Sequence, residues 1–86
     1  MSETEDKLMK IWMEALQLPT LGLDESFLDL GGDSLTAMSC ISRIRADFGV
    51  EFPLEEFFLD GASISEFARI IDRLHDETHH QDHTAV

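Results

Sequence analysis

The chain has 86 residues, of which 43% are hydrophobic, and 6 Lys and Arg residues against 18 Asp and Glu residues give a formal net charge of −12. That length allows one domain with one core, and the apolar content argues against global disorder. The acidity argues against nucleic-acid binding, no apolar run approaches the roughly 20 residues of a membrane span, and the single cysteine excludes an intrachain disulfide.

The first predicted element is an amphipathic helix near the N-terminus. Ser2 and Glu5 have the spacing of a capping box at its start. The apolar positions that follow recur at i, i+3, i+4, i+7 and i+8, which is one helical face. They are Leu8, Ile11, Trp12, Ala15 and Leu16. Pro19 and Gly22 are expected to end this helix.

A long connection without clear periodicity follows, over residues 18–33. Residues 24–27 could form a short turn of helix within it. Loops of this length in a compact domain are usually functional. We expect Phe27, Leu28 and Leu30 to hold the connection against the core.

The spacing predicts a second helix over residues 34–48 and a short one over residues 54–59, opened by Pro53. Gly49 is a suitable stop for the second helix. Its buried stripe is expected at Ala37, Ile41, Ile44 and Phe48, with Cys40 at the margin as a packing residue. Residues 50–52 alternate as a strand does, but three residues are too few for a sheet.

Ser63 and Glu66 form a second capping box before the last predicted helix. Its apolar face is expected at Ile64, Phe67, Ala68, Ile71 and Leu74. After about Glu77 the chain is polar and rich in histidine, which predicts a domain over residues 1–77 and a flexible tail over 78–86. The sum is an all-α fold: a small four-helix bundle of three main helices and one short helix, with a long first loop.

One short motif, Gly31-Gly32-Asp33-Ser34, stands where the second helix begins. Two glycines allow a tight turn and a close approach of the backbone, and either Asp33 or Ser34 can cap the helix. A helix N-terminus also stabilises an anion, so a phosphodiester on Ser34 would be favoured there. The alternative is a loop-to-helix junction with a polar cap and no further role.

Three segments of the chain carry a resemblance to a known family. They are IWMEALQLPTLGLDESFLDLGGDSL, ISRIRADFGVEFPLEEFF and SISEFARII. Together they resemble the phosphopantetheine-dependent carrier proteins, most closely the peptidyl carrier domains of nonribosomal peptide synthesis. The resemblance implies that a phosphopantetheinyl transferase uses coenzyme A and Mg²⁺ to place 4'-phosphopantetheine on Ser34, at a site shaped by Gly31, Gly32 and Asp33. The arm's thiol then carries an aminoacyl, peptidyl or acyl group as a thioester.

The same resemblance implies a carrier without catalysis of its own. Its partners would be an adenylation or acyltransferase loading enzyme and a condensation, ketosynthase or tailoring enzyme, met through an apolar patch of Leu35, Met38 and Phe57, with Phe58 in the core. Helical spacing alone equally allows all three patch residues to be ordinary core. We expect a cytoplasmic monomer. The segment LDGAS at residues 59–63 departs from the family's frequent Pro-Thr entry to the last helix, and the strong acidity leans towards stand-alone acyl carriers. A polyketide-type acyl carrier is the alternative subtype.

Two other functions compete with the carrier interpretation. Residues 32–35 also spell the signature of the "GDSL" hydrolases, in which Ser34 would need His75 as base and Asp72 to orient it. The chain is too short for that fold, lacks its strands and contains no Asn for its oxyanion hole. An acidic helical adaptor that is never modified would explain the charge but not the double glycine.

The histidines near the C-terminus could in principle bind Zn²⁺ or Ni²⁺. His75, His79 and His83 have i, i+4 spacing, and His80 is adjacent. No apolar residue organises them, so a solvated end without metal is the expectation.

Overall fold

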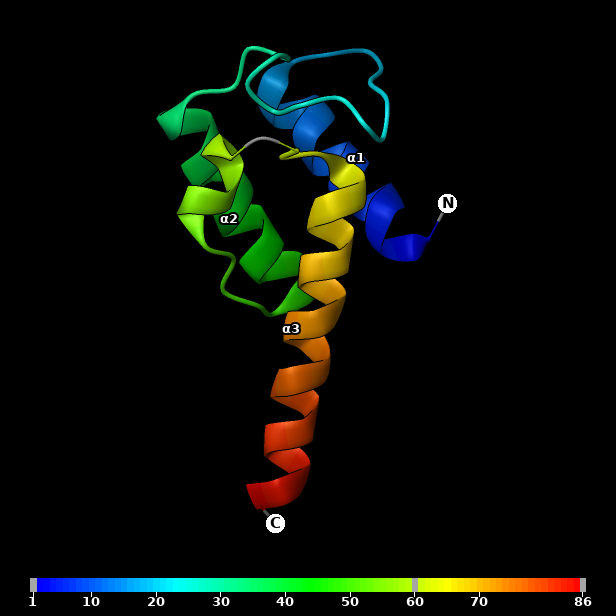
Figure 1. Cartoon of the computed structure of the whole chain (residues 1–86), viewed down its shortest axis with the longest axis vertical. Coiled ribbons are helices and arrows are strands. Elements are labelled where there is room, and N and C mark those ends of the chain that lie inside the picture. Colours follow the sequence, from blue (N-terminus) through cyan, green and yellow to red (C-terminus); the bar gives the residue numbers. More distant parts are fainter. Residues whose placement is uncertain (1, 60, 86) are drawn as a thin grey trace.

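The computed structural model describes residues 2–59 and 61–85, with the backbone alone over residues 77–85. Three α-helices and one short 3-10 helix follow in chain order: α1 (Glu3–Leu16), α2 (Ser34–Phe48), η1 (Leu54–Phe58) and α3 (Ile64–Ala85). α1 packs against both α2 and α3, and η1 packs against α2 (Figure 1). The described residues contain no strand, so the all-α prediction is confirmed.

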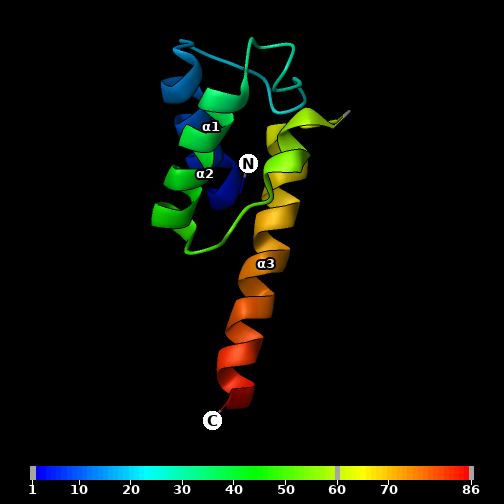
Figure 2. The same ribbon diagram turned by 90° about the vertical axis from the view of Figure 1, so that its left-hand side faces the viewer.

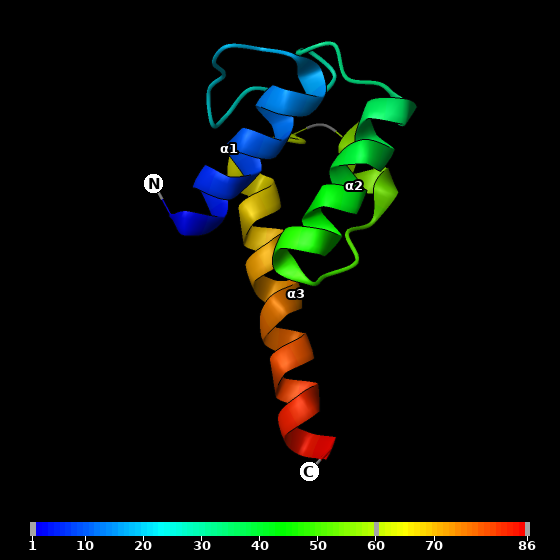
Figure 3. The same ribbon diagram turned by 180° about the vertical axis from the view of Figure 1, so that it is seen from behind.

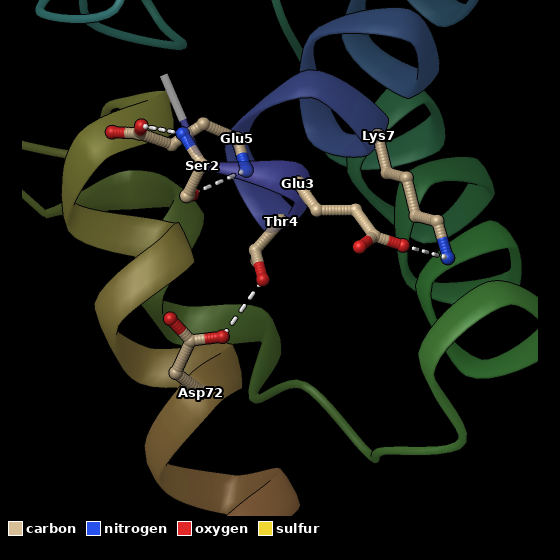
Figure 4. Close-up of polar contacts among 6 residues, drawn as sticks. All are labelled: Ser2, Glu3, Thr4, Glu5, Lys7 and Asp72. Carbon is tan, nitrogen blue, oxygen red and sulfur yellow. Dashed lines mark hydrogen bonds and ion pairs between the residues drawn. The ribbon is translucent and has the colours of Figure 1, made fainter.

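α1 begins with the predicted capping box, which Figure 4 shows. The Ser2 hydroxyl accepts a hydrogen bond from the Glu5 backbone N–H at 3.1 Å, and the Glu5 carboxylate accepts one from the Ser2 N–H at 2.9 Å. One turn satisfies two backbone donors that the helix leaves unpaired. The Thr4 hydroxyl then donates to the Asp72 carboxylate at 2.8 Å, which joins the start of α1 to α3 (Figure 4).

α1 ends at Leu16, just before the connection predicted from residue 18, and Pro19 and Gly22 lie beyond that end. Gln17 adopts the left-handed conformation with φ 57° and closes the helix. The Gln17 and Leu18 N–H groups both donate to the Met13 carbonyl, the Leu18 bond at 3.0 Å. These bonds satisfy a C-terminal carbonyl without a glycine, while Leu18 packs on the core.

Four aromatic side chains from four different segments form the centre of the core. The ring centroid of Phe27 lies 5.2 Å from that of Trp12 and 4.8 Å from that of Phe57. The ring centroids of Phe57 and Phe67 are 4.7 Å apart. All three pairs meet edge to face, the favourable arrangement for aromatic quadrupoles. Phe27 is fully buried, so the long loop contributes a central core residue. Leu30 packs partly against the core, whereas Leu28 is 45% exposed and does not anchor the loop as expected.

α2 faces the core with Ala37, Cys40 and Ile44, each fully buried. Cys40 therefore lies at the centre of the stripe and not at its margin, while Ile41 and Phe48 are only partly buried. Gly49, with φ 71°, ends the helix as predicted.

α3 begins at the predicted position, where the Ser63 hydroxyl accepts from the Glu66 N–H at 3.3 Å. The helix continues to Ala85, past the end expected near Glu77 (Figure 1). The flexibility expected for residues 78–86 stays a prediction. Within the described part of the chain, no helix is both long and apolar enough to cross a membrane.

Candidate functional site

The part of the loop that leads into α2, residues 27–33, is fixed to the core at Phe27. The Phe27 N–H donates to the Ala62 carbonyl at 2.8 Å, and the Gly32 N–H donates back to the Phe27 carbonyl at 3.0 Å. One bond ties the loop to the segment that precedes α3, and the other closes a tight turn over residues 27–32. The position of the helix start is therefore set by a buried aromatic residue.

The two glycines of the motif are required for different reasons. Gly31 has φ 92°, a left-handed conformation that strains any residue with a side chain. Gly32 has no positive φ, but a Cβ atom at this position would overlap the ring of Phe27. The loop can close over the core only because the backbone at Gly32 lies directly on that ring.

Asp33 caps α2, which decides between the two predicted caps. Its carboxylate accepts hydrogen bonds from the Thr36 N–H at 2.9 Å and from the Thr36 hydroxyl at 2.8 Å. These bonds, the backbone one foremost, lower the pKa of Asp33 below its ordinary value of 3.8. Ser34 is then the first residue of the helix, with its hydroxyl free of capping.

The lowered pKa of Asp33 makes the stability of this junction dependent on pH. A carboxylate with a depressed pKa stabilises the fold above its unfolded pKa, and that contribution is lost as pH falls through the folded value. We expect Asp33→Ala to lower the thermal unfolding midpoint at pH 7, and the difference from wild type to shrink below about pH 3.8. Unfolding followed by circular dichroism across this range measures it. A difference that stays constant with pH would contradict the role of the ionised cap.

Ser34 is exposed and is the first residue of α2. The start of this helix lies at one end of the bundle (Figure 1). A Cβ atom built on Gly31, three residues earlier in the chain, would meet no atom within 4 Å, so the space beside Gly31 is open. The first N–H groups of α2 and the helix dipole favour a phosphodiester on the Ser34 oxygen. The residues at this junction therefore fit a phosphate-linked prosthetic group.

The structure does not assemble the triad that the hydrolase interpretation needs. His75 lines a recess with Phe48, the last residue of α2, whereas Ser34 is the first. Fourteen residues of helix separate these ends by about 21 Å. The Asp72 carboxylate accepts from Thr4. Neither His75 nor Asp72 therefore lies beside Ser34.

The residues that the structure describes contain no group of three His, Cys, Asp or Glu side chains that could hold a metal ion. The side chains of His79, His80 and His83 lie outside the described residues.

The three predicted patch residues divide into two groups. Leu35 and Met38 are 79% and 58% exposed, so they are not core residues. Phe57 is fully buried in the aromatic cluster, and its assignment to the surface is wrong. Its neighbour Phe58, predicted to be core, is 39% exposed. Adjacent residues of a five-residue 3-10 helix point in different directions, and the spacing of two phenylalanines cannot tell which faces inwards.

Sequence reasoning also missed apolar side chains at both ends of η1. Leu54 is 39% and Leu59 is 52% exposed. η1 packs against α2, and Figure 2 shows η1 near the start of α3. The available signal in the sequence was the number of apolar residues in this short segment, since a helix of five residues buries few of them.

Burial raises the pKa of the Cys40 thiol to about 12, from an ordinary value of 9.0. At pH 8 the folded protein would then hold about a thousandfold less thiolate at Cys40 than an exposed thiol. We expect no alkylation by iodoacetamide at pH 8 in the native state and full alkylation in denaturant, measured by intact mass. Rapid alkylation of the folded protein would contradict the packing role.

Comparison with known proteins adds to this geometry. Residues 6–71, which include most of α1, the loop, α2, η1 and the start of α3, match the family model described as the phosphopantetheine attachment site. The chain belongs to this family. It is a carrier domain, and its prosthetic group is covalently attached phosphopantetheine. The resemblance that the sequence motifs indicated is confirmed.

Relatives of the carrier domain occur in large synthases. It is 42% identical over 57 residues to tyrocidine synthase 3 of Brevibacillus parabrevis, and 40% identical over 58 residues to the polyketide synthase PksN of Bacillus subtilis. These alignments cover 66% and 67% of this chain but only 1% of each relative.

A solved structure shows the same fold. It is the peptidyl carrier protein in complex with the phosphopantetheine transferase Sfp and coenzyme A, at 27% identity. The match has a TM-score of 0.80 and covers 85% of this chain and 94% of that one.

Proposed function

We propose that Ser34 is the attachment site of the 4'-phosphopantetheine arm and that the chain is a peptidyl carrier without catalytic activity. The observation that carries the proposal is the exposed Ser34 hydroxyl on the first residue of α2, inside the family region. Gly31 and Gly32 shape the approach to it, and Asp33 caps the helix. Residues 1–77 are the proposed carrier domain, and the cytoplasm is its proposed location, which suits a lone reduced cysteine.

The role of this chain is to keep the attachment residue in a fixed position while the arm moves. Phe27 anchors the loop in the core, and the cap at Asp33 fixes the first turn of α2. The bound arm supplies a thiol that carries the cargo as a thioester. A tether of this kind raises the effective concentration of the cargo at each partner enzyme to the millimolar range.

The proposed partners are a phosphopantetheinyl transferase, an adenylation enzyme that loads the thiol, and a condensation enzyme that uses the cargo. They would contact the exposed side chains of Leu35 and Met38 on α2 and of Phe58 on η1. Met adapts its shape to different surfaces, which suits a carrier that meets several enzymes in turn. The net charge of −12 favours basic contact surfaces on these enzymes.

Loading of the arm distinguishes the peptidyl subtype from the alternative, a polyketide acyl carrier. The modified protein is incubated with ATP, amino acids and a panel of adenylation domains, or with malonyl-coenzyme A and an acyltransferase. We expect an intact-mass gain of one aminoacyl group in the first set, which hydroxylamine removes because the bond is a thioester. A malonyl gain alone would assign the chain to the polyketide type.

A further inference from the structure

An open groove of about 540 Å³ lies between the end of α1 and the first half of α2. Figure 3 shows these two segments side by side. The groove is lined along its length by Ala15, Leu35, Met38, Ser39 and Ser42. A smaller recess shares three of these residues and adds Asp33 and Thr36, which flank Ser34 and Leu35 in the chain. The hollow surface therefore runs from beside Ser34 along α2.

An ion pair lies at the far end of this groove. Arg43 on α2 contacts Glu14 on α1 at 2.8 Å, and the hydrogen bond to Glu14 raises the pKa of Arg43. Nine residues of helix separate Ser34 from Arg43, which is about 13 Å along the axis. The groove thus has the proposed attachment residue, Ser34, near one end and the Arg43–Glu14 ion pair at the other.

The chemistry of the lining changes along α2 from apolar near Ser34 to polar further away. Ala15, Leu35 and Met38 supply apolar surface, and the exposed hydroxyls of Ser39 and Ser42 supply donors and acceptors. A phosphopantetheine arm has the same sequence of groups: a geminal dimethyl next to the phosphate, then a hydroxyl and two amides. An extended arm can span the distance from Ser34 to Arg43.

We propose that the phosphopantetheine arm rests in this groove between α1 and α2 when no partner enzyme is bound. The inference relies on the proposed attachment at Ser34. Since the arm is tethered beside the groove, its effective concentration there is about millimolar, and an intrinsic dissociation constant of about 1 mM would leave it half occupied. Weak contacts with Leu35, Met38 and Ser39 are therefore sufficient, and the arm still leaves quickly.

This arrangement couples partner binding to release of the arm. Leu35 and Met38 line the groove and are also proposed contacts for partner enzymes. An enzyme that covers these two side chains competes with the resting arm. Docking then frees the thiol to enter the enzyme's active site.

The test uses the full chain, labelled with ¹³C and ¹⁵N and modified with unlabelled coenzyme A, after intact mass has shown complete loading. Isotope-filtered nuclear Overhauser effects then report contacts between arm protons and protein methyl groups. We expect contacts from the geminal dimethyl and the amide-linked methylenes to the methyl groups of Ala15 and Met38. Contacts confined to residues 33–36, with the rest of the arm in solvent, would overturn the proposal.

A pair of variants distinguishes the groove from general effects of charge. Ser39→Arg places a long side chain in the groove, whereas Ala46→Arg adds the same side chain at an exposed site of α2 outside the lining. We expect the contact to Ala15 to disappear in Ser39→Arg and to persist in Ala46→Arg. Ser42→Arg, further from Ser34, replaces Ser39→Arg if the transferase does not load that variant.

The outcomes separate the two proposals. A folded wild-type protein that gains no arm contradicts the attachment at Ser34. A loaded protein without contacts at Ala15 and Met38 contradicts only the resting position of the arm. Contacts that survive in both groove-filling variants also contradict the resting position.

Discussion

Phe57→Ala is expected to cost about 3–5 kcal/mol of folding stability, the usual range for removing a buried phenylalanine. The Phe57 ring is fully buried and meets the rings of Phe27, Phe52 and Phe67 within 5.5 Å between centroids. Small domains have unfolding free energies near the low end of about 5–15 kcal/mol, so much of the variant would unfold at 37 °C. Urea unfolding followed by circular dichroism measures the loss.

Phe58→Ala is the matched control, since it makes the same change one residue further along η1. The Phe58 side chain is 39% exposed, so we expect a loss of stability well below that of Phe57→Ala. Its effect should instead appear as slower reaction with partner enzymes, measured by loading rates of the modified protein. Equal destabilisation by the two variants would contradict the assignment of Phe57 to the core and Phe58 to the surface.

Gly32→Ala is expected to destabilise the site and the core together. The added Cβ would overlap the Phe27 ring, and that ring is held by Trp12 and Phe57 on its other sides. Overpacking of this kind costs about 1–3 kcal/mol, because the ring or the loop must shift. We expect a lower unfolding midpoint, and slower attachment of the arm at temperatures where the variant is folded.

Gly22→Ala provides the comparison within the same loop. A Cβ at Gly22 approaches only the flexible Glu25 side chain, at 3.3 Å, and Gly22 has no positive φ. This variant should stay close to wild type in both stability and modification rate. If Gly32→Ala were equally harmless, the close packing of the backbone on Phe27 would not be a requirement of the site.

The sequence predicted the helices well because their signals are local. The Ser2 capping box, the stripe of Leu8, Ile11 and Trp12, and Gly49 at the end of α2 each depend on residues within one or two turns. The start of α2 was also predicted, since a polar cap after two glycines has few other uses. These features need no knowledge of what packs against them.

The features that were not predicted are those whose conformation or burial depends on tertiary contacts. Gln17 takes a left-handed conformation that its own preference does not indicate, and Leu18 then packs on the core. The predicted positions of Phe57 at the surface and Phe58 in the core were reversed, because the orientation of η1 is set by the aromatic cluster and not by its own sequence. The role of Gly32 could not be predicted, because its neighbour Phe27 is brought there by the turn.

The central claim is that Ser34 carries the phosphopantetheine arm. The most direct test is intact-protein mass spectrometry after incubation with coenzyme A, Mg²⁺ and a phosphopantetheinyl transferase, on wild type, Ser34→Ala and Ser39→Ala. Ser39 also has an exposed hydroxyl on α2, five residues further along. We predict a gain of one phosphopantetheine in wild type and Ser39→Ala and none in Ser34→Ala. A gain in folded Ser34→Ala, or none in folded wild type, would contradict the account.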